Sequence, residues 1–241
     1  MPVLLMRLEG PMQSWGTQSR FTVRDTGREP SKSGVIGLLC AALGIEREDD
    51  EGLSELSAVR MAVRIDRPGV IMRDYHTAGG GTWKGERYGV AKSSGAKPDT
   101  VVSTRYYLSD ASFLVALQSE DRELLEECDS ALRAPTWPLY LGRKSFVPGT
   151  PIPLPGGGVR DVDDLMAALR AAPLRLRRRE EPGKRLRCVV EVDDMDAEVR
   201  RDQPLCFQND ERSFGLRYVE DRWIDVADLT VQEVDACTSA S

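Results

Sequence analysis

The chain has 241 residues, of which 41% are hydrophobic, and a formal net charge of −6 at pH 7. This length and composition exclude an intrinsically disordered protein. The five cysteines are far apart and lack the spacing of metal ligands or of a redox pair, so we expect no metal, no cofactor and no disulfide. No stretch reaches membrane length or has the pattern of a signal peptide, which favours a soluble, cytoplasmic protein.

The first predicted element is a buried strand at Val3, Leu4 and Leu5, which Gly10 and Pro11 bring to an end. A long polar loop follows, with almost no aliphatic residues. Its hydrogen-bond donors and its aromatic ring suit a polyanion with exposed bases. The candidate contacts in this loop are Gln13, Trp15, Arg24 and Arg28.

A helix is predicted next, because Ser31 is a favourable N-cap and apolar residues recur at helical spacing as far as Gly44. Free N–H groups and a partial positive charge at a helix start can hold a phosphate. Ser31, Lys32 and Ser33 are therefore a candidate phosphate seat. An ordinary cap on a core helix explains the same residues.

Three strands are predicted between residues 59 and 108. Residues 59–66 alternate between apolar and charged side chains, as in a half-buried strand. A second strand starts at Val70 and a third covers Val101 to Leu108. The candidate binding residues on these two strands are Arg73, Tyr75, His76, Arg105 and Tyr106.

The insertion from Thr77 to Asp99 contains six glycines and no Leu, Ile or Phe. Such a long stretch without its own core is commonly functional or disordered. Basic residues interleaved with aromatic ones are the composition expected at a nucleic-acid contact, although a Gly-rich excursion without a function fits as well. Its candidate contacts are Trp83, Lys84, Arg87, Tyr88 and Lys92.

A strand at Phe113–Leu117 and a helix at Asp121–Arg133 complete the order strand, helix, strand, inserted hairpin, strand, helix. This order indicates an α+β, ferredoxin-like domain if one more strand follows. That strand lies either near Ile152 or at Leu186–Val192.

Gly142, Arg143 and Lys144 precede Ser145 in a turn that lacks the spacing of a P-loop. A glycine followed by two cations can grip a phosphate, and a solvated surface turn is the alternative. Beyond it we expect a helix at Val162–Leu169, two strands at Arg212–Tyr218 and Trp223–Val226, and a loose tail after Asp235. The basic stretch from Arg175 to Arg187 is either a nucleic-acid contact or a solvated face.

The sequence contains one histidine, His76, which excludes mechanisms that need a histidine pair. A metal-free ribonuclease could use His76 with Tyr75 and a lysine. The same strand end serves equally well to stack on a nucleotide. Nothing in the sequence requires an enzyme.

The segments LEGPMQSWG, TGREPSKSGVIGLLCAALGI, RDYHT, SDASFLVAL and YLGRKS occur in this order and resemble the CasD family of type I-E CRISPR systems. The resemblance covers roughly Val3 to Phe146 and does not include the basic stretch.

The resemblance implies a ferredoxin-like, RRM-like domain of the repeat-associated class over residues 1–150, with the insertion as a protruding β-hairpin thumb. Residues 151–241 are then a C-terminal extension packed on that domain. It also implies a non-catalytic subunit of Cascade that caps the 5′ handle of the CRISPR RNA. The expected partners are the backbone and large subunits, with target DNA nearby.

Two alternatives stay open at this point. Relatives in type I-C systems process the transcript, so an endoribonuclease that uses His76 is one of them. The other is an assembly scaffold that binds only protein.

Overall fold

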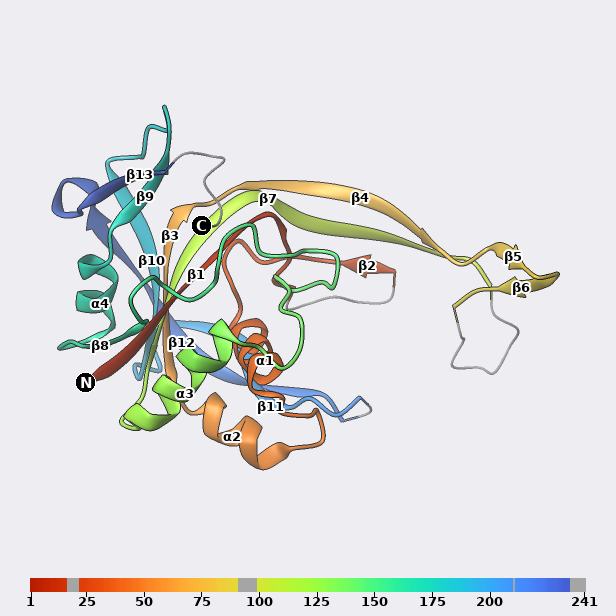
Figure 1. Cartoon of the computed structure of the whole chain (residues 1–241), viewed down its shortest axis with the longest axis horizontal. Coiled ribbons are helices and arrows are strands. Elements are labelled where there is room, and N and C mark those ends of the chain that lie inside the picture. The colour runs from red at the N-terminus through yellow and green to blue at the C-terminus, as the bar shows by residue number, and fades with distance from the viewer. Residues whose placement is uncertain (17–21, 91–98, 210, 235–241) are drawn as a thin grey trace.

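A nine-stranded, mostly antiparallel sheet organises the chain in the computed structural model, which describes residues 1–16, 22–90, 99–209 and 211–234 (Figure 1). Seven strands follow one another in the order β11-β12-β10-β3-β7-β1-β8, while β2 and β4 pair with the outer half of β7. The strands are β1 (Pro2–Gln13), β2 (Val23–Arg24), β3 (Arg60–Arg67), β4 (Val70–Ala78), β7 (Val101–Gln118), β8 (Val159–Asp161), β10 (Arg185–Val192), β11 (Glu198–Cys206) and β12 (Ser213–Asp225).

In the described part of the chain, four α-helices cover the two faces of this sheet. α1 (Lys32–Leu43), α2 (Asp50–Ser57) and α3 (Arg122–Arg133) belong to one hydrophobic core, and α4 (Leu165–Ala171) belongs to a second core on the other face. A 3-10 turn η1 (Val226–Asp228) leads to a small parallel sheet of β13 (Val231–Val234) and β9 (Leu174–Arg177). Within the described ranges, no helix has the length and apolar character needed to cross a membrane.

The helix predicted after the polar loop is confirmed as α1. The Ser31 hydroxyl accepts a hydrogen bond from the N–H of Gly34 at 3.3 Å, and Gly44 ends the helix in the left-handed region with φ 80°. The predicted helix before Ala134 is α3, which Asp121 caps through the N–H of Leu124 at 3.1 Å. Local capping chemistry thus sets both ends of α1 and the start of α3.

The prediction of a half-buried strand at residues 59–66 is wrong, because both faces of β3 are covered. Arg64 is 0% exposed although it is charged. Its guanidinium donates to Asp66 and to the carbonyl oxygens of Ala172 and Pro173, just after α4. Asp66 also accepts from Arg7 at 2.7 Å. The charged face of the strand is therefore an interior ion cluster beneath α4.

In two places, two strands that were predicted separately form one continuous strand in the structure. The strands expected at Val101–Leu108 and Phe113–Leu117 are both part of β7, which continues through Asp110 with φ 59°. Aspartate tolerates this left-handed conformation better than most residues, so the polar Ser109–Asp110 step does not end the strand. The two strands expected at the end of the chain are likewise joined in β12.

Both candidate positions for the last strand of the first domain contribute to the sheet. After Ile152 the chain pairs with β1, through a bridge between Met6 and Pro153 and then through β8. The other candidate, Leu186–Val192, lies within β10 and pairs with β3, on the opposite side of β7 and β1 from β8. The predicted helix at Val162–Leu169 is α4, which starts three residues later.

An arm projects from the body of the molecule (Figure 1). It consists of β4 and the first half of β7, paired from Val70↔Ser109 to Ala78↔Val101. A short hairpin of β5 (Gly81–Trp83) and β6 (Glu86–Tyr88) follows near its outer end. The arm therefore starts at residue 70, earlier than the insertion predicted from residue 77.

Candidate nucleic-acid interface

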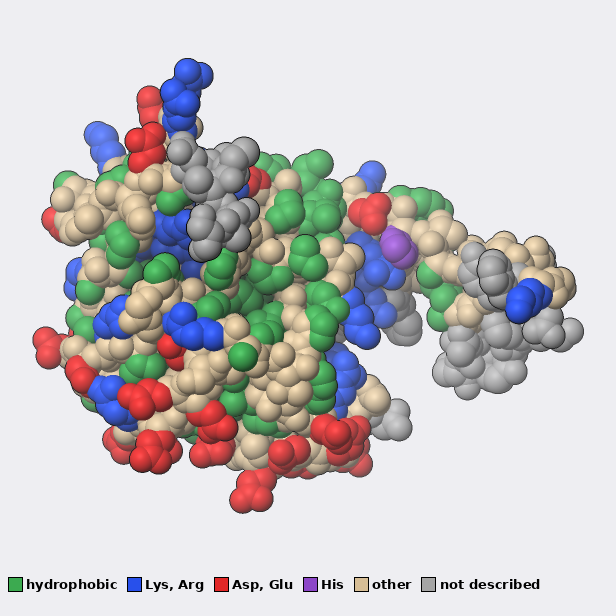
Figure 2. Space-filling view, in the orientation of Figure 1, with side chains coloured by type: hydrophobic (Ala, Val, Ile, Leu, Met, Phe, Trp, Pro, Cys, Tyr) green, Lys and Arg blue, Asp and Glu red, His purple; other side chains and the backbone are tan. Residues whose placement is uncertain are grey.

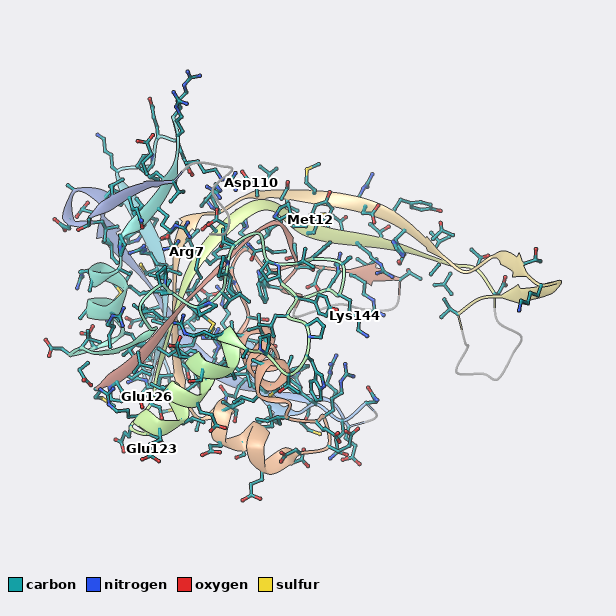
Figure 3. All side chains as sticks on the ribbon, viewed as in Figure 1. Arg7, Met12, Asp110, Glu123, Glu126 and Lys144 are labelled. Carbon is teal, nitrogen blue, oxygen red and sulfur yellow. The ribbon has the colours of Figure 1, made fainter. Side chains whose placement is uncertain are left out.

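A groove of about 880 Å³ lies beside α1 and collects side chains from four separate parts of the chain. Its cationic lining consists of Arg24, Arg47, Arg105, Arg143, Lys144 and Arg212, and its acidic lining, among the described residues, consists of Asp25 and Glu46. Figure 2 shows Lys and Arg side chains gathered between the body and the arm, and Figure 3 labels Lys144, which lies on the loop between α3 and β8. This groove gathers six cationic side chains in a chain whose net charge is −6.

The loop that carries Arg143 and Lys144 is fixed to the end of β1. The N–H of Ser14 donates to the Leu141 carbonyl at 3.0 Å, and the N–H of Phe146 donates to the Arg143 carbonyl at 2.8 Å. Gly142 has φ 94°, and a Cβ atom there would lie 1.8 Å from the Ser14 carbonyl oxygen. Only glycine fits this close approach, so Gly142 positions the two cations that follow it.

Arg24, Arg105 and Arg143 form a cluster of like charges at the arm side of the groove. Arg24 and Arg105 are partners in the β2–β7 pairing. Arg143 Nη2 donates to the Tyr106 carbonyl at 2.8 Å. Partial burial, followed by the positive charges of Arg105 and Arg24, lowers the pKa of Arg143. An anion bound here would relieve this repulsion, because an opposite charge stabilises each guanidinium.

Two residues predicted in the polar loop are buried instead. Gln13 is 0% exposed, and its amide nitrogen donates to the carbonyls of Leu8 and Ala111. Trp15 is 1% exposed, and its indole N–H donates to the Gln13 side chain at 3.1 Å. The Trp15 ring packs against Gly34, where an added Cβ atom would lie 2.8 Å from the ring. In this conformation neither side chain can serve as a platform for a base.

Acidic side chains of the protein itself bind the first residue of α1. The Asp202 carboxylate accepts from the backbone N–H of Lys32 at 2.8 Å, and Lys32 Nζ pairs with Glu191 at 2.9 Å. Burial is the main cause that lowers the pKa of Lys32, whose side chain is 2% exposed. Of the predicted phosphate seat, Ser31 and Ser33 line the groove, whereas Lys32 is an interior ion pair.

The other predicted contacts do not line the groove. Arg28, Arg73 and Tyr75 are exposed elsewhere, and Tyr75 is 72% exposed on β4. His76 lies on the arm with Nδ1 3.7 Å from Asp74. Tyr106 contributes only its carbonyl to the Arg143 contact. Near the tip, Lys84 is exposed, while the side chains of Trp83, Arg87 and Tyr88 and the whole of Lys92 lie outside the described part of the chain.

Several groove residues were not predicted. Trp137 and Tyr140 precede Gly142 in the same loop, so the local mixture of aromatic and basic residues could have indicated them. The others are distant in sequence from the first predicted contacts and carry no local motif. These are Arg47, Phe207, Arg212 and Phe214.

The basic stretch from Arg175 to Arg187 is partly structural. Arg177 pairs with Asp110 at 2.6 Å, and Arg187 pairs with Asp221 at 2.8 Å and with Glu29 at 3.1 Å. These ion pairs attach the stretch to β7, to β12 and to the segment before α1. Of its other cations, Arg175 is half-buried and Arg178, Arg179, Lys184 and Arg185 are exposed, and none of them lines the groove. The tail predicted to be loose falls on residues 235–241, which lie outside the described residues.

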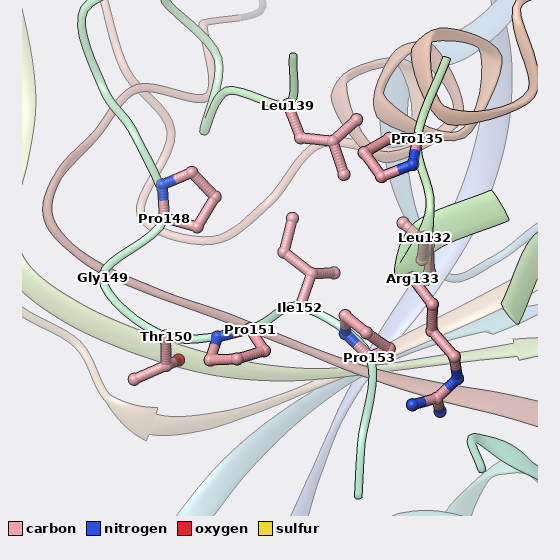
Figure 4. A pocket seen from close by; sticks show the side chains of 10 residues that line it. All are labelled: Leu132, Arg133, Pro135, Leu139, Pro148, Gly149, Thr150, Pro151, Ile152 and Pro153. Atoms are coloured by element: carbon pink, nitrogen blue, oxygen red, sulfur yellow. The ribbon is translucent and has the colours of Figure 1, made fainter. Parts of the chain in front are cut away.

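A second, smaller pocket of about 440 Å³ is largely apolar (Figure 4). Four prolines contribute to its lining, and its cation, Arg133, donates to the Leu154 carbonyl and to Asp129. Because this guanidinium already has internal partners, the pocket offers little attraction to an anion.

Comparison with known proteins gives a consistent result for this chain. Residues 3–220 match the profile of a family described as CRISPR-associated protein (Cas_Cas5). The chain belongs to the Cas5 family. This agrees with the resemblance found in the sequence motifs and extends it well beyond Phe146 into the C-terminal part.

Individual relatives support the same membership. The CRISPR system Cascade subunit CasD of Escherichia coli (strain K12) is 42% identical over 153 residues, which cover 59% of this Cas5 chain and 65% of that protein. The chain thus aligns with less than two thirds of this relative's length. Two solved structures match nearly the whole chain. "Crystal structure of Cas protein" gives a TM-score of 0.72 at 38% identity, covering 95% of this chain and 97% of the other. A chain of a "CRISPR RNA-guided surveillance complex" gives 0.76 at 37% identity, covering 96% and 94%.

Proposed function

We propose that this Cas5 family member is a non-catalytic subunit of a Cascade surveillance complex and binds the 5′ handle of the CRISPR RNA in the groove beside α1. The observation that carries the proposal is the charge of the groove. Among the described residues, six Lys or Arg side chains and two carboxylates line it, although the net charge of the chain is −6. A cationic groove with aromatic rings is the usual arrangement for single-stranded nucleic acid.

Within this proposal, the loop at Gly142 supplies the main phosphate contact. Arg143 and Lys144 follow a turn whose backbone is fixed by Ser14, and Arg24 and Arg105 stand beside them. Guanidinium groups form bidentate, charge-assisted hydrogen bonds with phosphate oxygens, and the preset loop reduces the conformational entropy lost on binding. Ser31 and Ser33 add neutral donors at the groove floor.

The fold offers a place for the proposed partners. We keep residues 1–150 as the domain, with β1, β7, β3, α1 and α3, and residues 151–241 as its extension. β8, the first strand of that extension, would complete the strand order of a ferredoxin-like unit beside β1. The arm is then the thumb. Val70, Ile71 and Met72 at its root are 44–63% exposed, as expected of a surface that a backbone or large subunit covers in the complex.

The main competing function is an endoribonuclease that uses His76. His76 lies on β4, outside the groove that carries the phosphate contacts, and its side chain is 44% exposed. A general base must come within hydrogen-bond reach of the proton that it removes. The position of His76 therefore favours a binding subunit.

The test is binding of a fluorescein-labelled RNA with the sequence of the 5′ handle, measured by fluorescence anisotropy. Changing Arg143 and Lys144 to Ala should weaken binding by about 1–3 kcal/mol, because charge-assisted hydrogen bonds are lost. The dependence of binding on salt should flatten as well. As a control for net charge, Arg160 and Arg170, which are exposed and lie outside the groove, are changed to Ala. Equal affinity and salt dependence in the two double variants would contradict the proposal.

A further inference from the structure

The groove has a second wall, which the last third of the chain builds. This wall consists of Phe207, Arg212 and Phe214 at the turn between β11 and β12, together with Arg47 from the loop after α1. Figure 1 places β2 and the outer ends of β11 and β12 on two sides of α1. The wall therefore belongs to a different part of the fold from the Arg143 loop.

The two arginines of this wall lie close enough to influence each other. Partial burial, followed by the positive charge of Arg47, lowers the pKa of Arg212. Arg47 Nη1 donates to the side-chain oxygen of Asn209, a neutral amide, at 2.6 Å. Glu46 also lines the groove beside Arg47 and is the acidic group that an entering anion would meet here. Two neighbouring guanidiniums are stabilised when a phosphate is bound between them.

An aromatic ring lies directly beside these cations. The Arg212 guanidinium carbon is 6.0 Å from the centre of the Phe207 ring. Phe207 packs against α1 beside Gly37. A Cβ atom on Gly37 would lie 3.8 Å from the Phe207 ring, so the ring and the helix are in close contact. The ring is partly exposed and is held from one side by the helix. A rigid, half-exposed ring next to a guanidinium is a suitable surface for stacking a base.

We infer that Arg47 and Arg212 form a second phosphate-binding pair and that Phe207 stacks on a base of the same strand, so that the bound RNA crosses the groove from the Arg143 loop to the β11–β12 turn. This inference rests on the proposed function and adds the path of the strand. The groove volume of about 880 Å³ lies within the range of about 300–1,000 Å³ that holds drug-sized ligands, so there is room for more than one phosphate.

The test uses the full chain and a fluorescein-labelled single-stranded RNA of the handle sequence, with anisotropy measured over a range of salt concentrations. Changing Arg47 and Arg212 to Ala should weaken binding about tenfold. The log–log salt slope should fall by about 0.7, because the pair binds one phosphate and each phosphate neutralised on a single strand contributes about 0.7. The Arg160→Ala, Arg170→Ala control removes the same charge and should leave the slope unchanged.

Phe207→Leu separates stacking from charge. This variant should weaken binding at least about fivefold, as expected for the loss of one stacked base, and leave the salt slope unchanged. Thermal unfolding checks that each variant is folded. If the Arg47/Arg212 variant binds like its control while the Arg143/Lys144 variant is weakened, the second wall is not part of the site and the inference fails. If both variants bind like the control, the proposed function fails instead.

Discussion

Replacing Gly142 with Ala tests whether the backbone of this loop must be glycine. Gly142 has φ 94°, and the added Cβ atom would lie 1.8 Å from the Ser14 carbonyl oxygen. The left-handed conformation costs roughly 1–2 kcal/mol for a residue with a Cβ atom. Forcing the loop away from Ser14 costs roughly 1–3 kcal/mol more, the range for overpacking. We therefore expect the free energy of unfolding to fall by about 2–5 kcal/mol.

Gly156 provides a matched control for this substitution. It has φ 73°, also in the left-handed region, but no atom lies within 4 Å of the position of its Cβ. Gly156→Ala thus includes the conformational cost without the clash, and should lower the free energy of unfolding by about 1–2 kcal/mol. Urea unfolding curves, extrapolated linearly to zero denaturant, measure both values.

RNA binding gives a second measurement on the same two variants. Gly142→Ala moves the backbone that holds Arg143, so the affinity for the labelled handle RNA should fall, whereas Gly156→Ala should leave it unchanged. If both variants lose the same stability and the same affinity, the close approach to Ser14 has no energetic importance and the argument is refuted.

Three further predictions concern other parts of the molecule. Asp66→Asn should lower the free energy of unfolding by about 3–5 kcal/mol in urea denaturation, because it leaves Arg7 and Arg64 buried without a counter-charge. Asp193→Asn, which alters an exposed pair, should change it by less than about 1 kcal/mol. His76→Ala should leave binding of the handle RNA unchanged, because His76 lies outside the groove. Metal-independent cleavage of repeat RNA by the wild type that disappears in this variant would contradict a non-catalytic subunit. A short Gly-Ser link in place of residues 79–97 should leave the body folded, as judged by circular dichroism, and impair assembly or target binding. Wild-type binding of target DNA by the assembled variant would mean that the segment is a passive loop.

The elements with local signals could be predicted from the sequence. Ser31 and Gly44 mark the ends of α1, and Asp121 marks the start of α3, because caps act on backbone groups only a few residues away. The turn at Gly142, Arg143 and Lys144 also carries its glycine and its two cations in consecutive residues, and its contact with a phosphate stays a prediction. In these cases the chemistry that decides the structure lies within one short segment.

The burial of charged and aromatic residues could not be predicted in this way. Alternating charges in β3 indicated an exposed face, but the carbonyls that satisfy Arg64 come from Ala172 and Pro173, more than 100 residues later. Trp15 lies in a polar segment, and its burial depends on the space left by Gly34 in the next helix. The second wall of the groove could not be predicted for the same reason, since Arg47, Phe207, Arg212 and Phe214 come from segments far apart in the sequence.

The continuity of β7 has a mechanical consequence for the arm. One end of this strand lies in the arm, and the other, from Phe113 to Leu117, is fully buried between β1 and β3. The arm is therefore a cantilever clamped in the hydrophobic core. At about 3.3 Å per residue, the nine residues of β4 give it a lever length of about 30 Å. A load applied near the tip is borne at the root, where Gly69 and Asp110 both have positive φ values. Bending should concentrate at these two residues, and it would change the shape of the groove beside α1, because Arg105 lies on the arm and lines that groove.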